Sequence, residues 1–278
     1  MGDLRHGRPL RRRPFLTDGE TPGHHTRGPG EIIRVLAVPG GAPAMTGSSP
    51  RSRTKDAYDA VAGDYAERFS GELSRKPLDR AMLSAFAEQV RDAGSRRVVD
   101  VGCGPGHVTA HLHGLGLEAS GVDLSPAMVA LASGAFPDLD FVVGDMTSLD
   151  ESDSSLGGLV AFYSIIHVPT GGLTDLFREF HRVLMPGGYL LLAFQAGEGR
   201  RSLSEWFGHR VSLEAYLRTP AQVVAFLEGV GLSVVARLLR PPIPGHETAE
   251  RAYVMARKAP APERQREIRH ARGGETHA

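Results

Sequence analysis

The chain has 278 residues with 32 basic and 32 acidic side chains, so its formal net charge is zero when the histidines are neutral. A neutral chain has no overall field to attract a charged polymer, and we therefore expect no nucleic-acid partner. No run approaches the roughly 20 apolar residues that cross a bilayer, so no membrane segment is expected. The only cysteine cannot form an internal disulfide, which indicates a reducing compartment, the cytoplasm.

The first 53 residues differ in composition from the rest of the chain. They carry nine arginines against four acids, many glycines and prolines, and little periodic apolar pattern. Such a composition buries too little apolar surface to fold. We expect residues 1–53 to form a disordered basic tail, residues 54–258 one domain, and residues 259–278 a flexible C-terminal tail. A basic tail could contact RNA, but this one lacks the interleaved aromatic residues on which bases stack.

From residue 98 onward, short apolar runs alternate with amphipathic segments. The runs expected to form strands are 98–101, 119–122, 141–143, 159–162, 189–194, 232–239 and 252–256. Residues 173–184 and 221–227 are expected to be helices, the first because its apolar residues recur at helical spacing before a Pro-Gly-Gly sequence. This alternation is typical of an α/β domain with a parallel sheet and helices on both faces.

The most informative motif follows the first of these strands. It reads Asp100-Val-Gly102-Cys-Gly104-Pro-Gly106. Its glycines permit backbone angles closed to other residues and lack the Cβ atoms that would keep a ligand away from the backbone. The acid stands at the sheet edge where α/β proteins bind ligands, and a carboxylate there suits an ammonium group. The turn indicates an amino-acid-like ligand, because a dinucleotide fingerprint needs glycine where His107 stands.

Two further strands also end in acids. Asp123 lies 21 residues after Gly102, close to the spacing at which a carboxylate binds a ribose diol. The same side chain could instead cap the helix expected to begin at Pro126. Asp145 closes the third strand and, as a carboxylate, can accept a hydrogen bond from an amino group. Because parallel strands end at one edge of the sheet, we expect the three acids to line a common site.

These residues resemble the class I S-adenosylmethionine-dependent methyltransferases, whose first motif is an acid-x-Gly-x-Gly-x-Gly turn. The resemblance covers about residues 56–258. It implies an α/β, Rossmann-like, doubly wound sheet of seven strands, mostly parallel with an antiparallel strand 7, in the order 3-2-1-4-5-7-6. It also implies S-adenosyl-L-methionine as the cofactor, and methyl transfer to oxygen, nitrogen or carbon of a small-molecule acceptor.

The resemblance assigns roles to individual residues. Met128 would pack on the adenine, Asp145 would accept from the adenine amino group, and the Met146 amide would meet a ring nitrogen. Tyr65 lies in a segment like the family's entry helix and would contact the methionine end of the cofactor. For Met128 and Tyr65, packing in the core is the alternative. The expected cofactor-binding residues are Tyr65, Asp100, Gly102, Gly104, Gly106, Asp123, Leu124, Met128, Asp145, Met146 and Ser164.

A phenol or alcohol acceptor would need a base, and His167 is the candidate. It follows the fourth strand, whose end faces the methyl site in the family, and an imidazole titrates near neutral pH. A capping or packing role is the alternative. The loops 195–219 and 241–250 should supply acceptor contacts, with Trp206 and Glu247 among the candidates by location.

Several functions are disfavoured or left open by the same sequence. The fourth strand lacks the Asn/Asp-Pro-Pro-aromatic turn of enzymes that methylate nucleobase amines or glutamine amides. The histidines show no metal-ligand spacing, so we expect no metal. Two alternatives stay open, namely a non-catalytic S-adenosylmethionine sensor and an RNA-directed methyltransferase that uses the basic tail. Neither the acceptor nor the oligomeric state follows from the sequence.

Overall fold

The computed structural model describes residues 48–261, and its centre is a seven-stranded sheet in the order β3-β2-β1-β4-β5-β9-β8. Five strands run parallel, namely β1 (Arg97–Val101), β2 (Glu118–Asp123), β3 (Phe141–Val143), β4 (Leu156–Phe162) and β5 (Leu184–Gln195). At the other end of the sheet, β9 (Arg251–Lys258) is antiparallel to both β5 and β8 (Leu232–Arg240). The predicted topology is confirmed, with β8 and β9 as the sixth and seventh expected strands.

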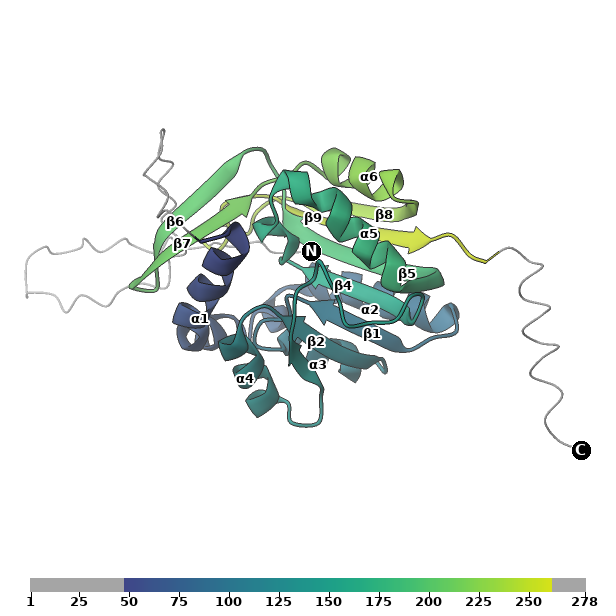
Figure 1. Cartoon of the computed structure of the whole chain (residues 1–278), viewed down its shortest axis with the longest axis horizontal. Helices are drawn as coiled ribbons and strands as arrows, with labels where there is room; N and C mark the ends of the chain where they lie inside the picture. The colour runs from purple at the N-terminus through teal and green to yellow at the C-terminus, as the bar shows by residue number, and fades with distance from the viewer. Residues whose placement is uncertain (1–47, 262–278) are drawn as a thin grey trace, which may run out of the picture. The chain divides into compact units, whose positions relative to one another are not determined.

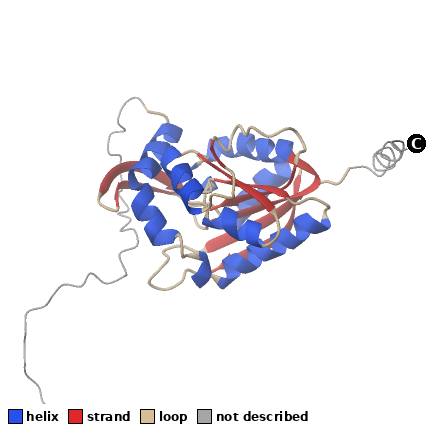
Figure 2. Cartoon of the chain, turned by 90° about the horizontal axis from the view of Figure 1, so that it is seen from below, coloured by secondary structure: helices blue, strands red, loops and turns tan. Residues whose placement is uncertain are grey.

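Helices cover both faces of this sheet (Figures 1 and 2). On one face, α5 (Leu173–Val183) and α6 (Pro220–Gly229) pack on strand residues such as Val99. On the other face, α2 (Pro77–Asp92) and α3 (His107–Gly114) pack on the neighbouring residue Val98. Successive strand residues point to opposite faces, so each apolar run supplies two cores. The remaining sheet helix, α4 (Pro126–Ala135), lies against β2 and β3.

A helix and a hairpin form a separate unit over one part of the sheet. The helix is α1 (Pro50–Phe69), and the hairpin consists of β6 (Arg200–Trp206) and β7 (His209–Tyr216). Figure 1 shows the two side by side at the left, and their apolar residues make a third buried cluster. We call residues 50–69 and 200–216 the cap. The sequence predicts only a loop where the hairpin stands.

Helix α1 begins earlier than the expected domain does. Ser49 caps it by accepting a hydrogen bond from the Ser52 amide, and Pro50 occupies the first helical turn, where a missing N–H costs nothing. Residues 50–53, which the sequence places in the expected tail, are therefore helical. Residues 1–47 and 262–278 lie outside the described residues.

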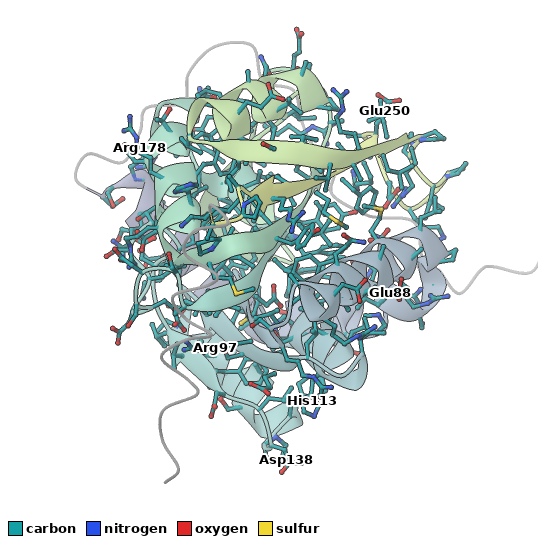
Figure 3. All side chains as sticks on the ribbon, turned by 90° about the vertical axis from the view of Figure 1, so that its right-hand side faces the viewer. Glu88, Arg97, His113, Asp138, Arg178 and Glu250 are labelled. Carbon is teal, nitrogen blue, oxygen red and sulfur yellow. The ribbon has the colours of Figure 1, made fainter. Side chains whose placement is uncertain are left out.

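Two expected absences concern metals and membranes. Within residues 48–261 no group of His, Cys, Asp and Glu side chains is arranged to hold a metal ion. No helix in this part of the chain is long and apolar enough to cross a bilayer. Figure 3 shows charged and polar side chains such as His113 and Asp138 pointing outward, and both are exposed.

Candidate functional site

The strand ends that carry the acids border a cavity of about 530 Å³ beneath the cap. Its lining includes most of the residues expected at a cofactor site, namely Tyr65, Gly102, Gly104, Asp123, Leu124, Asp145, Met146 and Ser164, together with His167. A second cavity of about 50 Å³ shares Tyr65 and the glycine turn with the first and contains Asp100. The structure thus brings ten expected residues around two neighbouring cavities, whereas Gly106 and Met128 line neither.

Asp100 has an incompletely satisfied carboxylate. The side chain is 1% exposed. Oδ2 accepts a hydrogen bond of 2.8 Å from the Thr109 hydroxyl, and Oδ1 has no partner among the described residues. Burial raises the pKa of Asp100 to about 7, against the opposing effect of the Thr109 hydrogen bond. A buried oxygen without a donor is costly, and a cationic group in the smaller cavity would remove that cost.

The same small cavity offers donors for an anion. His107 and Lys76 line it with Asp100. The His107 Nδ1 atom is buried without a partner among residues 48–261, and burial lowers the pKa of this imidazole. One acceptor and two groups with N–H bonds around a small space fit a zwitterionic amino-acid group. This supports the amino-acid-like ligand that the glycine turn predicts.

Two of the three glycines of the turn make room for neighbouring protein side chains. All three have positive φ, and a Cβ on Gly102 would lie 2.3 Å from the Ser164 Cβ. A Cβ on Gly106 would lie 2.8 Å from the Phe141 ring. At these two positions the missing Cβ makes room for protein side chains. Only at Gly104 is the space open, with Tyr65 as the nearest neighbour at 3.9 Å.

Asp123 joins the ends of β1 and β2. Its two carboxylate oxygens accept hydrogen bonds of 2.8 Å from the amides of Gly104 and Ser125. Burial raises the pKa of Asp123, and these backbone donors oppose the rise. The N-cap of α4 is Ser125, whose Oγ accepts from the Met128 amide. Asp123 therefore does not cap that helix, and its oxygens keep lone pairs for a diol in the large cavity.

Asp145 and Met128 differ from their expected surroundings. The Asp145 carboxylate accepts from the Thr147 amide at 2.9 Å and pairs with the Arg51 guanidinium at 2.6 Å. A bound amino group would share this carboxylate with an arginine of the cap. Met128 is 0% exposed and packs inside the domain. It lines neither cavity, so its contact with the adenine stays a prediction beside the core-packing alternative.

The cap is tied to the sheet domain by residues that the sequence does not single out. Asp59 of α1 accepts from the Ser125 hydroxyl at 2.5 Å and from the Ala127 amide at 3.2 Å. It also pairs with Lys55 one helical turn earlier, at 2.8 Å. An acid suits the N-terminus of α4, where backbone N–H groups are free and the helix dipole is positive. The cap thereby holds Tyr65 in the walls of both cavities.

Both ring nitrogens of His167, the candidate base, have hydrogen-bond partners within the protein. It ends the short 3₁₀ helix η2 (Ile165–His167), and its ring bridges two elements of the cap. Nδ1 lies 2.8 Å from the Glu214 carbonyl oxygen, and Nε2 lies 2.8 Å from the Tyr58 hydroxyl. Burial lowers the pKa of His167 to about 4. The buried Arg218 holds this segment in place by donating to the Ile165 carbonyl.

The aromatic residues of the hairpin build the cap and do not line either cavity. Trp206 meets the rings of Tyr58 and Tyr65 edge-on, with centroids 5.4 and 5.5 Å apart. His209 lies 3.0 Å from the Asp64 carboxylate on the cap surface. Trp206 is therefore a packing residue of the cap.

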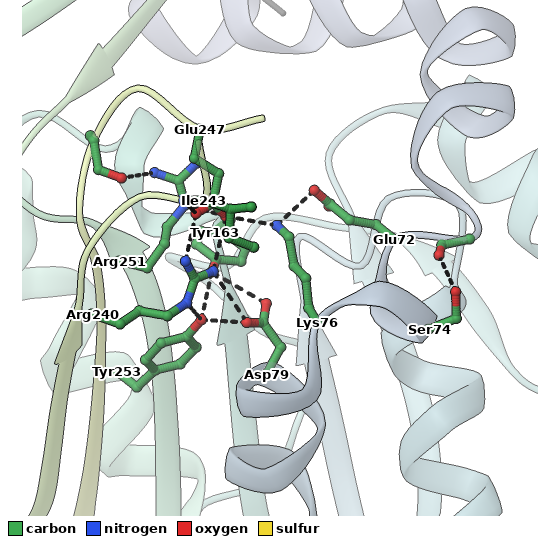
Figure 4. A network of polar contacts seen from close by, with 12 residues as sticks. Glu72, Ser74, Lys76, Asp79, Tyr163, Arg240, Ile243, Glu247, Arg251 and Tyr253 are labelled. Atoms are coloured by element: carbon green, nitrogen blue, oxygen red, sulfur yellow. Dashed lines mark hydrogen bonds and ion pairs between the residues drawn. The ribbon is translucent and has the colours of Figure 1, made fainter. Parts of the chain in front are cut away.

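A buried charge network stands beside the smaller cavity (Figure 4). Glu247 accepts from Arg240 at 2.5 and 2.9 Å and pairs with Lys76 at 3.1 Å. Burial raises the pKa of Glu247, but hydrogen bonds from Arg240 and a backbone amide outweigh it and lower the pKa to about 2. Asp79 accepts from Arg240 and from the Tyr253 hydroxyl. The network joins α2, β8 and β9, so Glu247 is a structural residue.

Comparisons with known proteins agree with this geometry. Residues 98–188 match the family model described as a methyltransferase domain. A demethylmenaquinone methyltransferase of Chlorobaculum tepidum is 29% identical over 152 residues, which are 53% of this chain and 61% of that protein. A trans-aconitate 2-methyltransferase of Shigella flexneri is 38% identical over 124 residues, covering 44% of this chain and 46% of that protein. The chain thus spans about half to three fifths of the length of these two relatives.

A solved structure extends the likeness beyond residues 98–188. The magnesium protoporphyrin IX methyltransferase of Synechocystis PCC 6803, with bound S-adenosylmethionine, has a TM-score of 0.59 and 18% identity. The match covers 78% of this chain and 100% of that chain. At this identity the likeness concerns the fold alone.

Proposed function

Because the chain belongs to the class I S-adenosylmethionine-dependent methyltransferases, we propose that it binds S-adenosylmethionine in the two cavities and methylates a small-molecule acceptor. The atom methylated is an oxygen, nitrogen or carbon. One observation carries this proposal. The acids at the ends of three adjacent parallel strands line two neighbouring cavities that share wall residues, and one of these acids, Asp100, has a buried oxygen without a partner among the described residues.

The residues present fit the parts of the cofactor. In this proposal Asp100 holds the ammonium group, and His107 with Lys76 holds the carboxylate, in the smaller cavity. Asp123 holds the ribose diol, and Asp145 accepts from the adenine amino group. The unpaired oxygen of Asp100 supports this fit, since an ammonium supplies the donor that the protein does not.

When bound, the cofactor supplies a methyl group made electrophilic by its sulfonium. What the protein adds is position and exclusion of water. The large cavity also has lining that the cofactor roles do not use, including Thr54, Tyr58, Val168 and Pro169. We assign this part to the acceptor. Holding the reacting atoms in line can contribute about 7 to 11 kcal/mol in well-oriented systems.

The acceptor class is proposed from shape and from the relatives. The surplus lining combines apolar and aromatic residues such as Tyr58 and Val168 with polar ones such as Thr54, and the relatives include enzymes named for demethylmenaquinone and trans-aconitate. Quinols, phenols and small carboxylic acids are therefore the acceptors to test before RNA.

Calorimetric titration with S-adenosylmethionine tests the cofactor assignment. Asp123→Ala should weaken binding at least 10-fold, because charge-assisted hydrogen bonds contribute about 1.5–3 kcal/mol each. Asp138→Ala removes an exposed acid (Figure 3) and should leave the affinity unchanged. Equal affinity for both variants would remove Asp123 from the ribose role, and absent binding by the wild type would refute the proposal.

A transfer assay with radiolabelled methyl then tests the activity. The acceptors are a panel of quinols, phenols, alcohols, amines, carboxylic acids and structured RNA. Label in one small molecule supports the proposal. Cofactor binding with label in none of them would favour the sensor alternative, and label in RNA alone would contradict the small-molecule assignment.

A further inference from the structure

Three groups form a continuous chain of hydrogen bonds along the large cavity. The Glu214 carbonyl oxygen on β7 meets His167 Nδ1, and His167 Nε2 meets the Tyr58 hydroxyl on α1, each at 2.8 Å. Tyr58 and His167 both line the cavity that contains the glycine turn and Asp123. This series of hydrogen bonds therefore ends at the space that we assign to the methyl acceptor.

The chemistry of the three groups sets the direction of every bond. A carbonyl oxygen only accepts, so His167 Nδ1 must carry the proton and donate it to Glu214. The imidazole is neutral, since burial lowers its pKa to about 4. Nε2 then has only a lone pair, and Tyr58 must donate its proton to it.

This leaves the Tyr58 oxygen with lone pairs only. Burial raises the pKa of Tyr58, and the charge of Asp123 adds to the rise, so the phenol stays protonated. Its single proton is already given to His167. A molecule that meets this oxygen must therefore bring the hydrogen atom of the bond itself, as an O–H or N–H group does.

The Tyr58 hydroxyl is held in one direction by packing. Its ring meets the rings of Tyr65, Trp206 and His167 edge-on, with centroid distances of 5.3 to 5.7 Å. Aromatic pairs of this kind restrict the ring, and a fixed group needs no reorganisation during the reaction. The Tyr58 oxygen, which would accept the hydrogen bond from the substrate, is thus preorganised.

We propose that Tyr58 and His167 form a proton relay that selects an acceptor with a hydroxyl or N–H nucleophile and removes its proton. The inference rests on the proposed function. As the acceptor's lone pair forms the new bond to the methyl carbon, the electron pair of the carbon–sulfur bond stays on sulfur. The acceptor's O–H or N–H bond breaks and its proton passes to the Tyr58 oxygen. The former Tyr58 proton passes to His167 Nε2, and the positive charge that began on sulfur ends on the imidazolium.

A carboxylate, a thioether or a carbon nucleophile does not fit this relay. A carboxylate or a thioether presents lone pairs to the lone pairs of the Tyr58 oxygen. A carbon nucleophile without a hydroxyl or N–H group offers no comparable donor. The relay thus narrows the acceptor from oxygen, nitrogen or carbon in general to hydroxyls and neutral amines, with phenols and quinols included.

The first test reads the relay without turnover. Protein with ¹⁵N-labelled histidine is saturated with S-adenosylhomocysteine and titrated with phenol or with anisole, its methyl ether. We expect His167 to show a protonated Nδ1 and an unprotonated Nε2. Phenol should shift the Nε2 resonance in the wild type but not in Tyr58→Phe, and anisole should shift it in neither. A protonated Nε2, or equal shifts by the two probes, would overturn the relay.

The second test separates proton transfer from structure. A glutamine at position 167 can donate to the Glu214 carbonyl and accept from Tyr58, but it cannot take up a proton. With an acceptor found in the transfer panel, His167→Gln and Tyr58→Phe should lower kcat 100-fold or more, the range of general acid–base catalysis. KM for S-adenosylmethionine should change less than threefold. Tyr189→Phe removes a phenol hydroxyl outside both cavities and should keep wild-type kcat.

The two tests distinguish the failure of the relay from the failure of the proposed function. Full kcat in His167→Gln, or transfer only to carboxylates or carbon, refutes the relay while the methyltransferase assignment stands. If the wild type transfers methyl to no acceptor, the proposed function fails, and the ¹⁵N titration by itself decides whether the relay exists.

Discussion

The unpaired carboxylate of Asp100 makes a quantitative prediction about the pH dependence of cofactor binding. Its pKa of about 7 means that roughly 3% of the folded protein carries the ionised form at pH 5.5, and about half at pH 7.0. An ammonium group needs that ionised form, and apparent affinity falls in proportion to the competent fraction. The affinity for S-adenosylmethionine should therefore rise roughly 15-fold between pH 5.5 and 7.0, a range in which an α-amino group stays mostly protonated.

Titration calorimetry at several pH values measures this change directly. At pH 6 about nine tenths of Asp100 is protonated, so binding should release close to one proton per site, seen as a dependence of the heat on the buffer. Asp100→Asn keeps an acceptor for the Thr109 hydroxyl and should lose this part of the pH dependence. Adenosine lacks the amino-acid group and should bind the wild type equally well at both pH values.

Two results would refute the reasoning on Asp100. One is an affinity for S-adenosylmethionine that is flat from pH 5.5 to 7.0. The other is the same slope with adenosine or in Asp100→Asn, because the slope would then come from another group. Thermal unfolding of Asp100→Asn shows whether the variant retains the fold on which the comparison depends.

Three further predictions concern the framework around the cavities. Gly102→Ala should destabilise the fold by more than about 2 kcal/mol, since its Cβ would meet Ser164 at 2.3 Å at a φ of +70°; an unchanged urea midpoint would contradict this. Glu247→Gln should cost about 3 kcal/mol at pH 7, because a pKa of about 2 against 4.5 stabilises the fold above pH 4.5. The wild type loses that advantage as the pH falls towards 2, and a variant with the same acid sensitivity would refute the role of Glu247. Asp59→Ala should speed amide exchange in α1 but not in the central strands, because its bonds to Ser125 and Ala127 attach the cap; equal rates would show that packing alone holds it.

The sequence predicts the sheet well because each strand carries its own signal. Each strand is a short apolar run that can be recognised by itself. The run 98–101, for example, predicts β1, and the glycine turn that follows it predicts a ligand-binding loop. The helix expected at 173–184 ends one residue earlier, at Val183, because Leu184 is already extended and begins β5. These patterns are local, so they predict the elements without knowledge of contacts between distant segments.

The cap is harder to predict, because its signals come from packing between distant segments. The hairpin strands are rich in charged residues, and they pack mainly on α1. Met128 shows the reverse difficulty. Its place in a helix next to the ribose acid suits an adenine contact and core packing equally well, and only the packing around α4 separates the two.

The position of His167 illustrates why a candidate base is hard to judge from sequence. Its location after β4 is predictable, but its burial and its hydrogen bonds depend on residues 58 and 214, far away in the chain. A free imidazole would titrate near neutral pH, whereas burial lowers the pKa of His167 to about 4, against the opposing effect of the Glu214 hydrogen bond, and so keeps the ring neutral. A histidine at this position can thus be a free imidazole or a buried neutral one, and the sequence alone does not distinguish the two.

The acids of the proposed cofactor site and two of the three groups of the proposed relay lie in different parts of the protein. The matched methyltransferase domain, residues 98–188, contains the glycine turn, the three acids and His167. Tyr58 and the Glu214 carbonyl lie outside it, in the two elements of the cap. If the relay selects the acceptor, specificity depends on segments that the family model does not describe. The domain would then fix the cofactor, and the cap would decide which acceptor can give up a proton.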